Sequence, residues 1–231
     1  MSWDGIIIGA GHNALVLQAY LGKAGLKVLS IDRRHIAGGG LATMEDPRRP
    51  GFLHNTHAFF QRAITAMPWY ADLELERRGA KYIEPELNVS MITSDDRSLE
   101  WWTDIDRTIA SFENFSKKDA ATLKRWQSDF VPIVRDILAW EAKSPPLPVK
   151  ERRALLEKSA AGRRLLEVSA LSPLEFVHQE FEHPAVKAGL LFFNGLREVD
   201  LRVKGFGHHI AALLASPAKA QMSRGGSAAL A

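Results

Sequence analysis

The stretch that decides the fold is GIIIGAGHNAL, residues 5–15. Its three consecutive isoleucines are typical of a strand that is buried on both faces of a parallel sheet. Glycines at positions 9 and 11 end that run, and residues 14–21 are good helix formers. A second apolar run, residues 26–31, ends at Asp32 and predicts a second strand. Strand, helix and strand within about thirty residues form one βαβ unit.

The turn inside this unit matches the dinucleotide-binding pattern G-x-G-x-x-G/A. Gly9 permits a tight turn, Gly11 lets the backbone approach a pyrophosphate, and the small Ala14 lets the helix pack close to the strand. Asp32 follows about twenty residues later, where a carboxylate accepts hydrogen bonds from the adenosine ribose and repels a 2′-phosphate. The alternative is a glycine turn in an unrelated α/β protein, with Asp32 as a surface charge.

The residues after Asp32 separate the two cofactors that satisfy this pattern, NAD and FAD. A plain NAD-binding domain continues into another crossover helix. This chain continues instead into a glycine-rich loop, residues 33–43, and the sequence predicts irregular structure as far as residue 56. A loop of this length inside a compact domain is usually functional or disordered. Its position beside the nucleotide disfavours the alternative of a small NAD-binding protein.

Several short motifs occur in order: GAGHNAL at residues 9–15, Asp32-Arg33, Gly38-Gly39, Thr43, and Pro-Gly-Phe at residues 50–52. Together they resemble the phytoene desaturase-like flavoproteins of the amine-oxidase superfamily. The branch that they resemble most closely is that of pyridine nucleotide-disulfide oxidoreductase domain-containing protein 2. The family usually has Glu where Asp32 stands, a conservative difference that shortens the reach to the ribose.

The resemblance implies FAD as the cofactor and assigns the residues that surround it. The pyrophosphate side is formed by Gly9, Gly11, His12, Asn13 and Ala14, the adenosine side by Asp32 and Arg33, and the path toward the flavin by Gly38, Gly39, Gly40 and Thr43. His54 or His57 would lie near the flavin ring or the substrate, and the alternative is that both are ordinary loop histidines. No other residue is predicted to be catalytic.

The resemblance also implies an α/β fold: an FAD-type Rossmann domain with an inserted helical and short-strand substrate region. We expect the nucleotide-binding half at residues 1–60 and the substrate region at 61–222. That region begins with strands at about 80–103, including a hairpin, and continues mainly as helices. Residues 223–231 would begin the return to the FAD domain, through a Gly-Gly turn that enters a long helix. Aromatic side chains of the helical part, such as Trp126 and Phe192, are predicted to form core rather than a substrate cavity.

Composition excludes several classes of protein. The chain has no cysteine, which excludes disulfide scaffolds and thiolate metal sites. The histidines lack nearby ligands, so no metal site is predicted. A net charge of +3 gives no reason to expect nucleic acid as a partner. No apolar run approaches the roughly 18–20 residues of a membrane span, and no signal peptide precedes the first strand, so we expect a cytoplasmic protein.

The family's fold extends beyond what residues 1–231 supply, since its C-terminal part would close the FAD domain over the flavin. The favoured interpretation is a split enzyme: a subunit of an FAD-dependent oxidoreductase whose site is completed by a second polypeptide. Hydride would pass from a C–H or C–N bond of an apolar organic substrate to the flavin. The alternatives are a fragment of a longer chain and a non-catalytic subunit that stabilises or binds a partner oxidoreductase.

Overall fold

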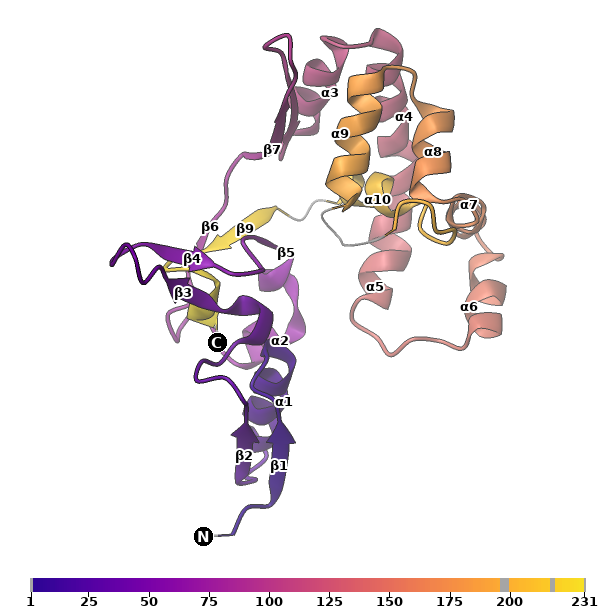
Figure 1. Ribbon diagram of the computed structural model, residues 1–231. Coiled ribbons are helices and arrows are strands. Elements are labelled where there is room, and N and C mark those ends of the chain that lie inside the picture. Colours follow the sequence, from indigo (N-terminus) through magenta and orange to yellow (C-terminus); the bar gives the residue numbers. More distant parts are fainter. Residues whose placement is uncertain (1, 196–199, 217–218, 231) are drawn as a thin grey trace. The chain divides into compact units, whose positions relative to one another are not determined.

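The computed structural model describes residues 2–195, 200–216 and 219–230. They form two compact units (Figure 1): Met1–Pro85 together with Ala218–Ala231, and Glu86–Pro217. The sequence places boundaries at residues 60 and 222, whereas the compact units divide near residues 85 and 218. The assignment of a substrate region remains a prediction.

The first unit begins with the predicted βαβ unit. Strand β1 (Gly5–Ile8) pairs in parallel with β2 (Val28–Ile31), and α1 (His12–Lys23) connects them. Gly25 follows the C-cap of α1 with a φ of +86°, a left-handed conformation that a glycine adopts without steric cost and that ends the helix. The predicted order and positions of these elements are confirmed.

The expectation that β1 is buried on both faces is wrong for these residues. Ile6 and Ile8, on one face of β1, are 61% and 93% exposed, and Ile31 at the end of β2 is 50% exposed. Within the described residues this parallel sheet has two strands, so the face away from α1 has no covering layer and both outer edges lack a neighbouring strand.

The glycine-rich region contains more regular structure than the sequence predicts. A short 3-10 turn, η1 (Gly39–Leu41), leads into β3 (Thr43–Glu45), which pairs antiparallel with β4 (Leu53–Asn55). The expectation of an irregular segment up to residue 56 is therefore wrong. The strands form because the turn between them brings their backbone groups into register. Each strand is too short for an alternation of apolar and polar residues to show in the sequence, so the pattern does not predict them.

A second small sheet closes the first unit. β5 (Gln61–Arg62) and β6 (Tyr82–Ile83) flank β9 (Ala220–Ser223), with both pairs antiparallel. Between β5 and β6 lie η2 (Ile64–Ala66) and α2 (Pro68–Asp72). Pairing with β9 is the reason why residues 61–85 group with residues 1–60. Beyond β9, the predicted Gly-Gly turn leads into η4 (Ser227–Leu230), a 3-10 turn.

The second unit opens with the predicted hairpin, β7 (Leu87–Ile92) and β8 (Ser98–Trp102), and continues as helices. In chain order these are α3 (Ile105–Glu113), α4 (Lys117–Ile133), the π-helical turn η3 (Val134–Leu138), α5 (Ala139–Glu141), α6 (Val149–Leu156), α7 (Ala160–Ser169), α8 (Pro173–Glu180), α9 (Pro184–Gly195) and α10 (His209–Ala215).

Aromatic residues of this unit are mainly core, as predicted. The rings of Trp126 and Phe176 stack with centroids 5.0 Å apart, and both side chains are buried. Trp140 and Phe192 are exceptions, 51% and 54% exposed. In the part of the chain that the structure describes, none of the helices combines the length and apolar character that crossing a bilayer requires.

Candidate functional site

The glycine turn between β1 and α1 has the backbone that a pyrophosphate site needs. Gly9 has a φ of +107°, and Gly11 is the extended N-cap residue of α1. A Cβ added at either glycine would meet nothing within 4 Å, so the space beside the turn is open. The first turn of α1 contains no acidic residue and receives no hydrogen bond from a capping side chain. Its amide groups and helix dipole therefore favour an anion.

The other residues predicted on the pyrophosphate side occupy the first turn of α1. His12 and Asn13 are exposed and Ala14 is partly buried. The helix thus presents two polar side chains at its N-terminus, next to the open space at the glycines.

Asp32 lies at the end of β2 and its carboxylate faces the glycine turn. One carboxylate oxygen accepts a hydrogen bond from the backbone N–H of Ala10 at 2.9 Å, and the other accepts one from the N–H of Arg34, also at 2.9 Å. These amides, Arg34 first and Ala10 second, lower the pKa of Asp32, and the positive charges of Arg34 and Arg33 act in the same direction. The carboxylate is therefore ionised at neutral pH, with lone pairs left for sugar hydroxyl groups.

The loop after Asp32 returns to the same turn. The N–H of Gly38 donates to the carbonyl of Ala10 at 2.7 Å, and Gly38 has a φ of +102°. A Cβ on Gly39 would lie 3.0 Å from the Cα of Gly11, so a side chain at Gly39 would fit only if the backbone of Gly11 moved by a few tenths of an ångström. The structure thus brings together the glycine turn, Asp32 and the Gly38-Gly39 pair, which lie far apart in the sequence.

The remaining predicted residues differ in their surroundings. Thr43 forms hydrogen bonds within the protein: its hydroxyl donates to the side chain of Asn55 at 2.9 Å and accepts from the N–H of Ala228 at 3.0 Å. The Nδ1 atom of His57 lies 3.8 Å from where a Cβ on Gly40 would be, beside the loop. His54 is an exposed residue of β4, opposite Met44. The catalytic roles suggested for the two histidines remain predictions.

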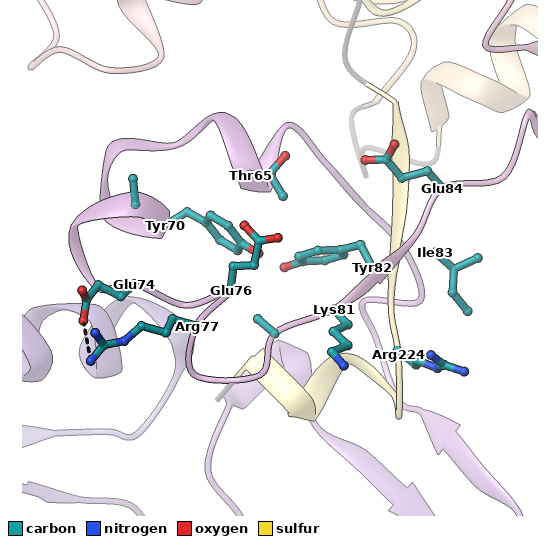
Figure 2. Close-up of a pocket in the computed structure, with 12 residues that line it drawn as sticks. Thr65, Tyr70, Glu74, Glu76, Arg77, Lys81, Tyr82, Ile83, Glu84 and Arg224 are labelled. Atoms are coloured by element: carbon teal, nitrogen blue, oxygen red, sulfur yellow. Dashed lines mark ion pairs between the residues drawn. The ribbon is translucent and has the colours of Figure 1, made fainter.

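A separate cavity of about 1020 Å³ opens in the first unit between α2, β6 and Arg224. Figure 2 shows the rings of Tyr70 and Tyr82 on its wall, together with Glu76. Burial raises the pKa of both phenols, and the charge of Glu76 adds to the effect on Tyr70. None of the residues predicted for the cofactor lines this cavity. This cavity therefore lies at a different place from the dinucleotide motif, and the backbone chemistry of the motif is the stronger evidence for a nucleotide site.

Among the described residues, no three His, Asp or Glu side chains are grouped closely enough to hold a metal ion.

Comparison with known proteins supports the nucleotide-binding assignment. Residues 7–72 match the NAD(P)-binding Rossmann-like domain family. That range contains the glycine turn, Asp32 and the glycine-rich loop, so these features belong to a Rossmann-like domain.

Two curated relatives cover most of the chain. One subunit of limonene dehydrogenase, from Castellaniella defragrans, is 32% identical over 82% of this chain, which corresponds to 34% of the relative. Pyridine nucleotide-disulfide oxidoreductase domain-containing protein 2 of Rattus norvegicus is 32% identical over 74% of this chain and 29% of its own length. The resemblance drawn from the motifs is confirmed, and the chain spans about a third of the length of these relatives.

Solved structures agree on the fold. Putrescine oxidase in its wild-type form bound to putrescine superimposes with a TM-score of 0.63 at 14% identity, covering 100% of this chain and 48% of the oxidase. A single mutant of the same enzyme, A394C, gives a TM-score of 0.61 at 17% identity, covering 99% of this chain and 47% of that one. The Rossmann-type α/β architecture with an inserted helical region is thereby confirmed.

Proposed function

We propose that this chain binds FAD and acts as a subunit of an FAD-dependent oxidoreductase. It carries a Rossmann-like domain, and a curated relative is a subunit of a dehydrogenase. One observation supports the proposal above the others. The carboxylate of Asp32 is fixed on the N–H of Ala10, while the Gly38-Gly39 pair packs against Gly11. The backbone of the glycine turn at residues 9–11 is thus in contact with the carboxylate of Asp32 and with the Gly38-Gly39 pair.

The residues present fit FAD. The diphosphate would lie against Gly9, Gly11 and the first turn of α1, where a Cβ would meet no atom within 4 Å at either glycine and where no acid competes. Asp32 would hold the adenosine ribose, and its ionised carboxylate would repel a 2′-phosphate. Arg33 would line the adenosine side.

The loop of Gly38, Gly39 and Gly40 would follow the cofactor from the pyrophosphate toward the flavin, with Thr43 at its end. A bound flavin would accept hydride from a C–H or C–N bond of an apolar organic substrate, and one relative is named as a subunit of a limonene dehydrogenase. The role of this chain is then to bind and orient. His57, beside Gly40, is better placed than His54 to approach the cofactor.

A second polypeptide would complete the site. Ile6 and Ile8 leave one face of the parallel sheet apolar and exposed, and monomers seldom leave such surface uncovered. One of the two relatives is a named subunit of a dehydrogenase. We therefore infer that the strands needed to cover Ile6 and Ile8 come from a partner.

The test is to isolate the chain with its bound partners from its natural source and to identify the cofactor released by acid. The wild-type complex should release FAD and show the visible absorption of an oxidised flavin. Gly11→Val should lose the flavin with the complex intact, because the new side chain occupies the pyrophosphate space. Gly5→Val is the matched control: a Cβ there also meets nothing within 4 Å, but the residue lies in β1, outside the turn.

The possible outcomes separate the alternatives. A nicotinamide dinucleotide in place of FAD would indicate a small NAD-binding protein. An intact complex whose flavin is insensitive to Gly11→Val would indicate a non-catalytic stabilising subunit. A yellow, monodisperse and fully active preparation of the chain by itself would refute the second polypeptide.

A further inference from the structure

Residues 226–228, near the C-terminal end of the chain, pack directly on the β3–β4 hairpin. Gly226 has a φ of +94°, and a Cβ there would lie 2.7 Å from both Oγ1 and Cγ2 of Thr43. This contact leaves no room for a side chain. Since Thr43 ends the glycine-rich loop, the far end of the chain touches the region beside the proposed cofactor.

A closed set of hydrogen bonds holds this contact. The Oδ1 atom of Asn55 accepts from the hydroxyl of Thr43 and from the N–H of Ser227, both at 2.9 Å. The hydroxyl of Thr43 in turn accepts from the N–H of Ala228 at 3.0 Å. The two bonds from the far segment span most of the chain, since Asn55 and Ser227 are separated by 172 positions and Thr43 and Ala228 by 185.

Ser227 extends the connection toward the glycines. Its side chain is 1% exposed, accepts from Nε2 of Gln61 at 3.1 Å, and donates to the carbonyl of Ala58. The N–H of Ala58 donates to the carbonyl of Gly40 at 3.1 Å. Buried bonds of this kind are costly to break, because the groups left behind lose their partners without regaining water.

The last step joins the loop to the glycine turn. Gly38 donates to the carbonyl of Ala10, and Gly39 lies against the Cα of Gly11. A continuous path of contacts therefore runs from Ser227 through Ala58 and the glycine-rich loop to the turn. Sequence reasoning did not find Asn55 or Ser227 as site residues, because neither belongs to the dinucleotide pattern.

We propose that Asn55 and Ser227 are positioning residues that hold residues 38–42 against the glycine turn and so preorganise the dinucleotide site. The dinucleotide part rests on the proposed function, whereas the support of the loop does not. Preorganisation matters here because a loop that must be ordered during binding lowers the affinity by the cost of ordering it. The coupling is reciprocal, so a bound ADP moiety slows amide hydrogen exchange at Ser227 and Ala228.

The experiment compares variants of the full chain by amide hydrogen exchange and by calorimetric titration with ADP. Asn55→Leu removes the acceptor and should speed exchange of the Gly38 and Ala58 amides and weaken ADP binding, each on the order of tenfold. Asn55→Asp keeps an acceptor oxygen and should restore both toward wild type. Ser227→Ala is a milder change that removes the hydrogen bond to Ala58. It should also speed exchange of these amides and weaken ADP binding, and it tests the proposal if Asn55→Leu fails to fold.

Gln221→Leu is the matched control. Gln221 is 3% exposed, lies on β9 just before the segment, and makes three hydrogen bonds, to Ile64, Thr65 and Glu84. Its loss should lower the melting temperature with the Gly38 amide exchange and the ADP affinity unchanged. The inference is overturned if Asn55→Leu and Ser227→Ala leave the exchange of Gly38 and Ala58 at wild-type rates, or if Gln221→Leu alters it equally. If the wild-type chain does not bind ADP, the proposed function fails, while the exchange rates still decide whether the segment supports the loop.

Discussion

Substitution of Gly39 by alanine tests whether the glycine-rich loop encloses the ligand. Two physical effects oppose a side chain there, a left-handed backbone and a contact with Gly11, and the first of them also occurs at Gly25. The φ of Gly39 is +61°, and a Cβ would lie 3.0 Å from the Cα of Gly11. Alanine in the left-handed region costs about 1–2 kcal/mol. The contact with Gly11 adds a second effect: since the neighbour is backbone, it must move by a few tenths of an ångström.

Gly25 shares the first effect without the second. Its φ is +86° and a Cβ there meets nothing within 4 Å. Gly25→Ala should therefore lower the free energy of unfolding by about 1–2 kcal/mol, and Gly39→Ala should lower it by at least as much. Only Gly39→Ala displaces the turn that would bind the pyrophosphate. Because hydrogen bonds to charged groups contribute about 1.5–3 kcal/mol each, weakening one should reduce ADP affinity about tenfold or more.

Titration calorimetry with ADP and thermal unfolding of both variants provide the two measurements. The expected result is a tenfold or greater rise in the dissociation constant for Gly39→Ala and none for Gly25→Ala, measured at a temperature where both are folded. Equal ADP affinity in wild type and Gly39→Ala would refute the claim that these glycines enclose the ligand.

Three further predictions concern other parts of the molecule. Folding lowers the pKa of Asp32, so the stability from its hydrogen bonds is present above about pH 4 and is lost as the pH falls through the folded-state pKa. The melting temperature of Asp32→Asn should therefore fall less on acidification than that of wild type, and parallel curves of melting temperature against pH would contradict this. Asp119 is buried and accepts hydrogen bonds from the N–H groups of Glu182 and His183, both at 2.9 Å. Asp119→Ala should therefore lower the free energy of unfolding of the helical unit by about 2–4 kcal/mol in urea titrations, and a loss below about 1 kcal/mol would contradict this. Ile8→Lys, at a side chain that is 93% exposed, should change the chain's own stability by no more than about 0.5 kcal/mol yet reduce capture of the partner polypeptide in pull-down assays, and undiminished capture would exclude this face as the interface.

The βαβ unit could be predicted because its signals are local. The roles predicted for Gly9, Gly11 and Asp32 follow from their spacing along the chain, and the structure brings these three residues together. The burial of β1 could not be predicted in the same way. Exposure of Ile8 depends on which strands lie beside it, and a run of isoleucines carries no information about that.

Long-range pairing explains the other differences. Residues 61–85 group with the first compact unit because β5 and β6 pair with β9, which follows much later in the chain. Asp119 shows the same limit on a smaller scale. Its spacing from Ser116 suggests a reciprocal capping box, and Ser116 does accept from the N–H of Asp119 at 3.1 Å. The carboxylate instead binds the amides just before α9, which only the packed structure reveals.

The most direct test of the central claim is to map ADP binding on the chain by nuclear magnetic resonance. We predict saturable shifts of the backbone amides of residues 9–13, of Asp32 and of residues 38–40, with the tyrosine-lined cavity at Tyr70 and Tyr82 unaffected. Shifts confined to that cavity, or none at the glycine turn at saturating ADP, would contradict the account.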